Sequence, residues 1–580
     1  MKKLFLTLFI MSSLLPFGFC QEGIVVLRIV EYTKYGALQS FTTRESEKFK
    51  EKQLAFVRLE NKISRLKQNG YLEASVDSIS FNNDTIIAVI HQGEKYEWTK
   101  IHFRGVDNSD LSTLGLRSLA KRRRFTSFTD IETLHTKVLS DLADNGYPFA
   151  QLELSEISFS GKKVRGEWVI KPHNFIQWDS IVLKGTAKIK AKFLQRYLGI
   201  YPNKKYNESN SESISKKITN LGFVKEIKSS EIEFDNGKAR VYTYLEKETA
   251  NQFDGIIGFQ SNKDNGKLEL TGEVKLALEN TFSAGESIRF NWQKYEESSQ
   301  NLSLGIVYPY LFSSILGIDI GFDIQKKDSA YISTAIDIGL RFSQSGKNFS
   351  KLFFKRNSSS LLTSSHLVGV SVLPVYADVK SNLYGYAYHF ENLDYSFNPK
   401  KGWDLNFSLA AGTHKTIKNS NISDELYNDI NLSGNLFEAE WMLEYNIPVK
   451  EKISIRLRNN GGIIDSKNLF QNDLFKLGGM STLRGFNEDS FRASRYTVMT
   501  AELRFIPQPN SSIYLFWDGG YYRNNYLVNR NEDYPWGIGF GFNFATRSGI
   551  FTLNYAVGKQ KNNSVDLQAA KIHFGYVNRF

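Results

Sequence analysis

Residues 497–506 read TVMTAELRFI, and the side chains of this stretch alternate in polarity along the chain. The odd positions, which include Met499 and Leu503, are apolar, whereas the even positions include Glu502 and Arg504. Successive side chains of a β-strand point to opposite faces of the sheet. The stretch therefore predicts a strand with one face toward lipid and the other toward a polar interior.

Two stretches on its C-terminal side alternate in the same way. Residues 512–521 place Trp517 on the outer face and Asp518 on the inner face, although Tyr514 and Phe516 share the inner parity. Phenylalanines at positions 540, 542 and 544 alternate with small or polar residues. The end of the chain carries aromatic or aliphatic side chains of one parity at Ile572, Phe574, Tyr576 and Phe580.

From about residue 251 onward the sequence shows short alternating segments and no helical period. A sheet that faces lipid must close on itself, because lipid cannot satisfy an open edge. With membrane strands of roughly ten residues, residues 249–580 accommodate an all-β transmembrane barrel of about 16 antiparallel strands, within a range of about 14 to 18. A soluble sandwich or propeller would not explain alternation that continues to the last residue.

The first half of the chain repeats one pattern three times. Gly70, Gly146 and Gly222 stand 76 residues apart, and each follows a segment with helical periodicity. Glycine is favoured just past the end of a helix, because it tolerates the left-handed backbone there. Two alternating segments joined by a turn follow each glycine, so each repeat is predicted to end in a β-hairpin.

The beginnings of the repeats also match. Residues 98–105 and 178–185 share a tryptophan, an isoleucine and a final glycine at equal spacing, and first helices are expected near 110–121 and 188–198. The predicted order is strand, helix, helix, strand, strand. Residues 24–92 fit this plan with a weaker first half. We therefore predict three small α+β modules at residues 21–95, 96–173 and 174–248.

Residues 1–20 have the layout of an export signal, with Lys2 and Lys3 ahead of an uncharged apolar stretch. Cys20 is the only cysteine, and lipidation of its side chain is an alternative to plain cleavage before Gln21. We expect no nucleic-acid partner for an exported chain, and the net charge of +12 favours anionic lipid or acidic partners.

Between two of the expected strands, residues 478–486 read GGMSTLRGF. Here the chain resembles the BamA/TamA superfamily of outer-membrane assembly and translocation proteins. In that family an Arg-Gly-Phe or Arg-Gly-Tyr loop folds back into the barrel, and its arginine pairs with acidic residues on the inner wall. The resemblance implies an inner-loop motif of Arg484, Gly485 and Phe486, with lumenal acidic partners Glu502 and Asp518.

The N-terminal modules look like POTRA modules, which bind extended chains by adding a strand to a sheet edge. A rigid spacer with no ligand is the alternative. Three modules before one barrel are similar to the layout of TamA, since BamA usually carries five modules and two-partner secretion transporters carry two. A two-module count with an extra N-terminal region stays open, because the first module is degenerate.

The resemblance implies a protein that inserts or exports unfolded client proteins at the outer membrane of a Gram-negative-type bacterium, with its modules in the periplasm. Clients would pass a lateral seam between the first and last barrel strands, marked by Phe253, Phe574, Tyr576 and Phe580. Outer-membrane lipid and a long periplasm-spanning TamB-like protein are the other expected partners. A two-partner-type transporter and a plain pore are the alternatives.

Motifs for catalysis are not found. The 8 histidines show no zinc-ligand spacing, and no phosphate-binding loop, dinucleotide fingerprint or Gly-x-Ser-x-Gly element is present. We therefore expect no cofactor, no metal and no enzymatic activity. Outer-membrane phospholipases and proteases are the competing class, because a Ser, His and acid assembled only in space would escape a search for local motifs.

Overall fold

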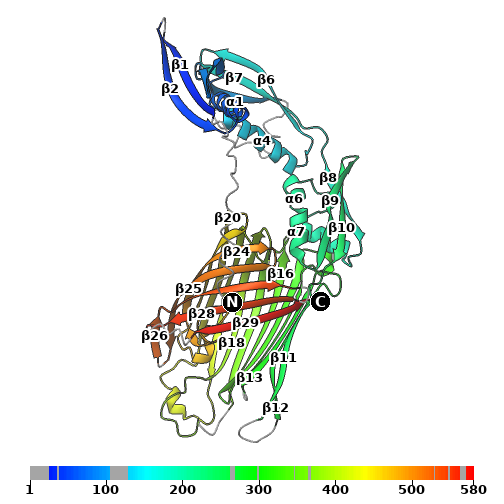
Figure 1. Cartoon of the computed structure of the whole chain (residues 1–580). Helices are drawn as coiled ribbons and strands as arrows, with labels where there is room; N and C mark the ends of the chain where they lie inside the picture. Colours follow the sequence, from blue (N-terminus) through cyan, green and yellow to red (C-terminus); the bar gives the residue numbers. More distant parts are fainter. Residues whose placement is uncertain are drawn as a thin grey trace, which may run out of the picture. The chain divides into compact units, whose positions relative to one another are not determined.

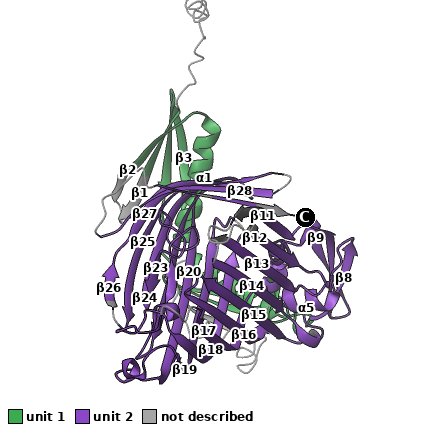
Figure 2. Cartoon of the chain, turned by 90° about the horizontal axis from the view of Figure 1, so that it is seen from below, with its two compact units in different colours: residues 1–176, 205–208 green, residues 177–204, 209–580 purple. Residues whose placement is uncertain are grey.

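The computed structural model (Figure 1) describes residues 25–35, 38–104, 128–261, 268–296, 299–344, 346–362, 367–396, 398–527, 529–546, 549–561 and 570–579. It divides into two compact units, one of residues 1–176 with 205–208 and one of 177–204 with 209–580 (Figure 2). The predicted export signal and Cys20 lie outside the described residues. In the described parts, no helix combines the length and the hydropathy needed to cross a membrane.

The first module differs from the predicted plan. Its elements are β1 (Val25–Tyr35), β2 (Leu38–Phe49), α1 (Lys52–Gln68), β3 (Ser75–Asn82) and β4 (Thr85–His91), with sheet order β2-β1-β4-β3. A second strand, β2, thus stands where a first helix was expected. This strand pairs with β1 over eleven positions, and at its end Glu45 and Glu47 face α1 and form ion pairs with Arg58 and Lys62.

The second module contains β5 (Glu97–Arg104), α4 (Phe128–Asp144), β6 (Gln151–Ser160) and β7 (Lys163–Lys171), in sheet order β5-β7-β6. The helix expected near 110–121 lies outside the described residues. Helix α4 buries Leu134, Val138 and Leu142 against Trp98 and Trp168 of the sheet. The helical period before Gly146 is thus the core-facing side of α4.

The third module belongs to the same compact unit as the barrel. It contains β8 (Gln177–Gly185), α5 (Ala191–Leu198), α6 (Glu208–Glu212), α7 (Ile214–Leu221), β9 (Val224–Asp235) and β10 (Lys238–Lys247), with sheet order β8-β10-β9. Gly222 ends α7 with φ of 78°, the left-handed conformation that its position predicted. The sheets of all three modules fall within the predicted module boundaries, which themselves stay predictions.

The rest of the chain forms a ring of antiparallel strands. In the described ranges, the ring has sixteen long strands, with β26 as a short addition to β25. The strands are β11 (Gln252–Ser261), β12 (Leu268–Glu279), β13 (Ser287–Glu296), β14 (Ser299–Tyr308), β15 (Leu316–Lys327), β16 (Tyr331–Ser343), β17 (Phe349–Leu361), β18 (Asp378–Leu393), β19 (Gly402–Ile417), β20 (Ser433–Lys450), β21 (Ile453–Asp465), β24 (Arg495–Gln508), β25 (Ser511–Tyr526), β26 (Asn529–Asp533), β27 (Trp536–Ala545), β28 (Gly549–Lys559) and β29 (Lys571–Arg579). The predicted fold class, α+β modules followed by an all-β barrel, is confirmed.

Short elements connect some of these strands. A two-stranded hairpin of β22 (Phe475–Leu477) and β23 (Phe491–Ala493) lies in the connection between β21 and β24. Single turns of 3-10 helix occur at η1 (Leu311–Ser313), η3 (Asp424–Tyr427) and η4 (Gln471–Asp473). The hairpin frames the glycine-rich segment that the sequence singled out.

The alternation that predicted the barrel corresponds to its two faces. Leu503 of β24 and Trp517 of β25 are exposed on the outer surface, whereas Glu502, Arg504 and Asp518 are buried on the inner one. Apolar side chains therefore face outward and charged side chains face inward, as in a barrel surrounded by lipid.

The ring is completed by very little pairing. Strands β11 and β29 share two residue pairs, Gln252 with Arg579 and Phe253 with Asn578. By contrast, β18 and β19 pair without interruption over sixteen positions. The seam between the first and last strands is thus the junction with the fewest backbone contacts in the described ring. Phe574 and Tyr576 lie on β29, and Phe580 lies outside the described residues.

Candidate functional site

The connection from β21 to β24 folds back against the inner surface of the barrel. Its glycine-rich segment turns with positive φ at Gly478, Gly479 and Gly485, a conformation that side chains with a Cβ rarely adopt. A Cβ at Gly485 would approach the backbone nitrogen of Gly558 in β28 to 2.7 Å, and a Cβ at Gly537 of β27 would collide with the carbonyl oxygen of Arg484. Glycines on both sides therefore permit the loop backbone to touch the barrel wall.

Apolar packing fixes the loop next to its charged residue. Leu483 is fully buried in a cluster with Leu477, Phe491 and Val498, and Phe486 packs on this cluster. The rings of Phe486 and Phe491 meet edge to face at 5.0 Å. Phe486 thus anchors the loop through packing, while Arg484, two residues earlier, points toward the charged wall.

Arg484 forms a buried ion pair with each of the two predicted acidic residues. Its Nε and Nη2 donate to the two carboxylate oxygens of Asp518 at 2.7 Å each, and its Nη1 donates to Oε1 of Glu502 at 2.8 Å. The fork of the guanidinium matches a carboxylate in this bidentate arrangement. Arg484, Glu502 and Asp518 expose 8%, 5% and 1% of their surface, so water screens the contacts weakly.

Neighbouring groups complete the coordination of this triad. Thr500 donates from its hydroxyl to Oδ1 of Asp518 at 2.9 Å, and the backbone N–H of Arg484 also faces this carboxylate, at 3.2 Å. The guanidinium lies 3.5 Å from the ring centroid of Phe516, which suits a cation–π contact. Phe516 therefore faces the interior of the barrel because its ring packs against the guanidinium of Arg484.

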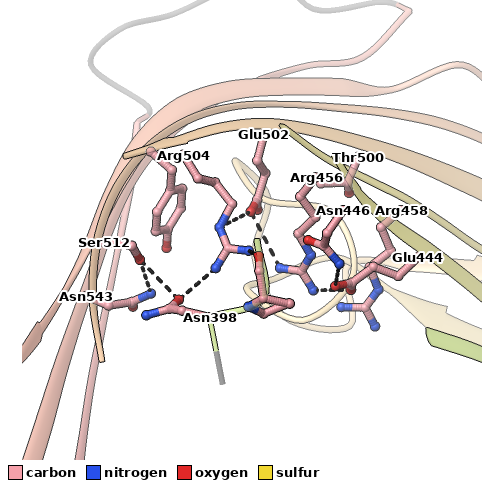
Figure 3. Close-up of polar contacts among 12 residues, drawn as sticks. Asn398, Glu444, Asn446, Arg456, Arg458, Thr500, Glu502, Arg504, Ser512 and Asn543 are labelled. Atoms are coloured by element: carbon pink, nitrogen blue, oxygen red, sulfur yellow. Dashed lines mark hydrogen bonds and ion pairs between the residues drawn. The ribbon is translucent and has the colours of Figure 1, made fainter. Parts of the chain in front are cut away.

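Glu502 also belongs to a wider polar network, which is drawn in Figure 3. Arg456 of β21 donates to Oε2 of Glu444 in β20 at 2.6 Å and lies 3.5 Å from Glu502. Arg504 donates to Oδ1 of Asn398 at 2.7 Å. The Asn398 side chain is buried, and its oxygen also accepts from Ser512 at 3.3 Å. The network thus connects β20, β21, β24 and β25 with the turn between β18 and β19.

The structure brings together Arg484, Glu502 and Asp518, and Gly485 and Phe486 support them from the same loop. The predicted seam residues are not part of this network, because they lie on β11 and β29. Glu444, Arg456 and Asn398 were not predicted from the sequence, and Arg504 was predicted to face the interior but not to belong to this network. The parity of β20 and β21 would have placed Glu444 and Arg456 inside, whereas a turn residue such as Asn398 carries no parity signal.

The paired charges of the network suit a structural role, in which they hold the loop and the surrounding strands in one arrangement. Every acidic group in the triad faces a guanidinium, and no serine, cysteine or histidine in it is paired with a base. The one group of metal-ligand type identified in the described residues, His389 with Glu391 and Asp404, lies on β18 and β19. It is separate from the arginine loop.

Two protein-family models match this chain. The Omp85 superfamily domain matches residues 280–580. The POTRA family, described as a surface antigen variable number repeat, matches residues 176–246. None of the curated protein sequences compared with the chain matches it.

Solved structures of similar fold were also found. CdiB from Acinetobacter baumannii is 14% identical with a TM-score of 0.52, and CdiB from Escherichia coli is 13% identical with a TM-score of 0.50. In both cases the likeness covers 91% of this chain and 98% of the other. BamA from Haemophilus ducreyi lacking POTRA domains 1–3 is 14% identical with a TM-score of 0.39, over 84% of this chain and 100% of the other.

At such identities the two CdiB structures support the fold alone. The family match is stronger, because it spans more than half of the chain, including the arginine loop and both of its acidic partners. It confirms the resemblance that the GGMSTLRGF segment and the terminal strands suggested. The chain belongs to the Omp85 superfamily.

Proposed function

We propose that this protein inserts or exports client proteins at the outer membrane of a Gram-negative-type bacterium, with its modules receiving unfolded clients in the periplasm. Membership of the Omp85 superfamily supports a general role in assembly or translocation. The chain offers no nucleotide-binding motif in its sequence, so the folding of the client itself would supply the driving force. No enzymatic step is part of the proposal.

The observation that carries the proposal is the seam. Two residue pairs join β11 to β29, so few backbone hydrogen bonds must break for the edges to separate. Each freed edge is a row of unpaired N–H and C=O groups, which lipid cannot satisfy but a client strand can. The seam residues Phe253, Phe574 and Tyr576 belong to these two edges, and Phe580 follows them in the sequence.

In this proposal, the triad of Arg484, Glu502 and Asp518 keeps the strands around it paired, whereas the strands at the seam separate. The loop would hold β24 and β25 in register while the seam opens. Its role is structural and conformational, since Arg484 forms ion pairs with both Glu502 and Asp518.

The modules would receive clients at sheet edges. Strands β3, β6 and β9 are edge strands of their sheets, and each ends in Ile-x-Phe just before the hairpin turn. The phenylalanines at these places, Phe81, Phe159 and Phe234, are exposed although they pair with buried residues of the central strand. An added client strand would cover them with its own apolar side chains.

A two-partner-type transporter is the second candidate function. The CdiB structures share the fold of this chain over most of its length. In such a transporter a dedicated exoprotein would pass through the lumen, and the seam would stay shut. A TamB-like periplasmic partner and direct binding of outer-membrane lipid belong to the first candidate, which the three-module layout favours.

Cross-linking the seam distinguishes the two candidates. Directly paired residues have Cα atoms about 4.5–5.5 Å apart, which a disulfide can span. We would introduce Phe253→Cys with Asn578→Cys in a chain whose Cys20 is replaced. As a matched control, Ile306→Cys with Ile320→Cys would cross-link the paired outer positions of β14 and β15.

If clients leave through the seam, oxidation of the seam pair stops client assembly and reduction restores it, while the control pair has no effect. If clients pass through the lumen, secretion continues with the seam locked. Continued client insertion into the membrane with a fully oxidised seam would overturn the first candidate.

A further inference from the structure

Strands β18 and β19 place three potential metal ligands on one face. His389 and Glu391 are two residues apart on β18, so their side chains point the same way, and Asp404 lies directly opposite Glu391 in the register. One ligand atom from each residue lies within 4.8 Å of the others. Trp403 and Phe407, of the other parity on β19, are exposed outside. The three ligands therefore face the barrel interior.

His389 meets a hydrogen-bond acceptor at each ring nitrogen. Its Nδ1 lies 3.0 Å from the backbone oxygen of Lys347, and its Nε2 lies 3.0 Å from Oδ1 of Asp404. A neutral imidazole carries one N–H, and neither a carbonyl nor an ionised carboxylate can donate. With its proton on Nδ1, the ring turns the lone pair of Nε2 toward the carboxylate, which is the orientation in which one metal ion could bind both groups.

A backbone carbonyl at Nδ1 is also the partner that orients histidine ligands in metal sites. Zinc bonded to nitrogen and oxygen ligands at about 2.0–2.1 Å with tetrahedral angles would separate Nε2 and Oδ1 by roughly 3.4 Å. The observed 3.0 Å therefore needs to widen by only a few tenths of an ångström. Strand pairing thus brings two of the three ligands, His389 and Asp404, close to the required separation.

The surroundings leave room for an ion. Lys347 is the cation nearest Glu391, with 3.7 Å between Nζ and Oε1, and its Nζ lies closer to the hydroxyl oxygen of Ser396, at 2.9 Å. Ser396 in turn donates to Glu391 at 3.2 Å. Lys347 can therefore keep its bond to Ser396 when Glu391 turns to an ion. A cavity of about 410 Å³, lined in part by His389 and Lys347, gives access to water.

We propose that His389, Glu391 and Asp404 form a binding site for one divalent transition-metal ion, with Zn²⁺ as the ion that the donor set fits best. One imidazole and two carboxylates make a three-ligand set that leaves a position for water. Ions such as Mg²⁺ prefer oxygen ligands alone. The spacing of histidines along the chain gave no sign of this site, because strand pairing brings Asp404 to the other two ligands.

Bound zinc would stiffen the rim of the barrel near the third module. The turn that follows β16 contacts this module, since the N–H of Gly346 donates to the carbonyl oxygen of Tyr197 at 2.6 Å. Lys347, next in sequence, supplies the carbonyl that orients His389. An ion bound to His389 would thus lie beside Lys347, and the preceding residue, Gly346, forms the backbone hydrogen bond between the module and the barrel.

The test is a metal titration of the purified full-length chain, folded in detergent, with affinity tags removed and metals stripped by chelator. Zn²⁺ binding is measured by calorimetry, and Co²⁺ absorption reports coordination by nitrogen. We expect one Zn²⁺ per chain with a Kd in the micromolar range or tighter. His389→Gln and Asp404→Asn should each weaken binding at least tenfold.

His414→Gln is the matched control. Nε2 of His414 also lies 3.1 Å from both carboxylate oxygens of Asp473, but this pair is not part of any three-ligand group found in the described residues. Zinc affinity should stay unchanged in this variant. Heat-dependent gel mobility verifies that each variant retains a folded barrel, and the near-isosteric Asp404→Asn guards against a folding defect in His389→Gln.

Absence of saturable Zn²⁺ and Co²⁺ binding by the folded wild-type chain would overturn the proposal and leave a protonated imidazole beside Asp404. Equal binding by wild type and His389→Gln would overturn it as well. Because these readouts measure metal alone, they are independent of whether clients pass through the seam.

Discussion

The wall from β18 to β25 and the seam between β11 and β29 belong to the same barrel, but different forces join their strands. In the wall, long backbone ladders are reinforced by buried side-chain contacts from Arg456, Arg484 and Arg504. At the seam, two residue pairs complete the ring. The barrel therefore combines a part resistant to separation with a part that can open at low cost.

This difference places a stable region, the wall, and a region that can open, the seam, in the same sheet. Buried ion pairs add little net stability when they replace good apolar packing, but breaking one by removing a partner is costly. The network of the wall thus specifies one arrangement of loop and strands. At the seam, two residue pairs join β11 to β29, so few backbone hydrogen bonds hold these strands together.

The largest effect is expected from Arg484→Ala. The substitution leaves Asp518 buried without a cation and removes the contact with Phe516, so we expect a loss of about 3–5 kcal/mol in the free energy of unfolding. Urea unfolding followed by heat-dependent gel mobility measures this loss. Arg495→Ala is the control, because Arg495 and Asp465 form an exposed ion pair that is worth at most about 1 kcal/mol. Equal losses of unfolding free energy in both variants would contradict a structural role for the triad.

A smaller effect is expected from Asn398→Ala. The buried amide oxygen accepts from Arg504 and Ser512, and its loss leaves these donors without that partner, at about 1–3 kcal/mol. Asn392→Ala, at an exposed position near the same turn, removes only an exposed hydrogen bond from Lys216 and should change stability by no more than about 0.5 kcal/mol. The same unfolding assay compares the two. A neutral Asn398→Ala would show that the turn is not part of the locked wall.

Alkaline pH should raise the stability of the third module but not that of the wall. Burial lowers the pKa of Lys217 on α7 from 10.5 to about 8. Between these values the unfolded chain binds more protons than the folded one, so module stability should rise with pH from about 8 to about 10.5. The shift sets an upper limit of about 3 kcal/mol on the rise, and solvent around the partly buried amine reduces it. The resonance of fluorinated Trp178, buried in this module, reports its unfolding. Lys217→Met should abolish the rise, and its persistence would assign the effect to another group.

The smallest effect is expected at the seam itself. Phe574→Pro changes a residue of β29 that pairs with Leu553 of β28 and has no pairing with β11 in the described residues, so we expect a loss of about 1 kcal/mol. Phe407→Pro makes the same change in β19, which is paired on both sides, and should cost about 3 kcal/mol or more. Urea unfolding again gives both values. Similar costs at the two positions would remove the distinction between seam and wall.

Local patterns predicted much of this architecture. Alternation along 497–506 and 512–521 assigned the two faces of β24 and β25, and the glycines before each hairpin located the ends of α1, α4 and α7. These features follow from the polarity and conformational freedom of neighbouring residues. The arginine loop needed the family resemblance as well, because its tripeptide alone is common.

Features that depend on distant pairing were not predictable. The first module was expected to begin with a strand and a helix, and β2 takes the place of that helix by pairing with β1 over eleven positions. The place of Asn398 depends on a turn that reaches β24. The approach of Asp404 to His389 depends on the register of β18 and β19. No local sequence pattern indicates any of these contacts.

Hydrogen exchange across the barrel in a lipid bilayer tests the central claim most directly, since protection of backbone amides reports local opening. We predict that the amides of β29 that face β11 exchange at least about a hundredfold faster than those between β18 and β19, equivalent to about 2.7 kcal/mol of opening free energy. Protection of β29 equal to that of β18 would contradict a barrel that opens at one seam.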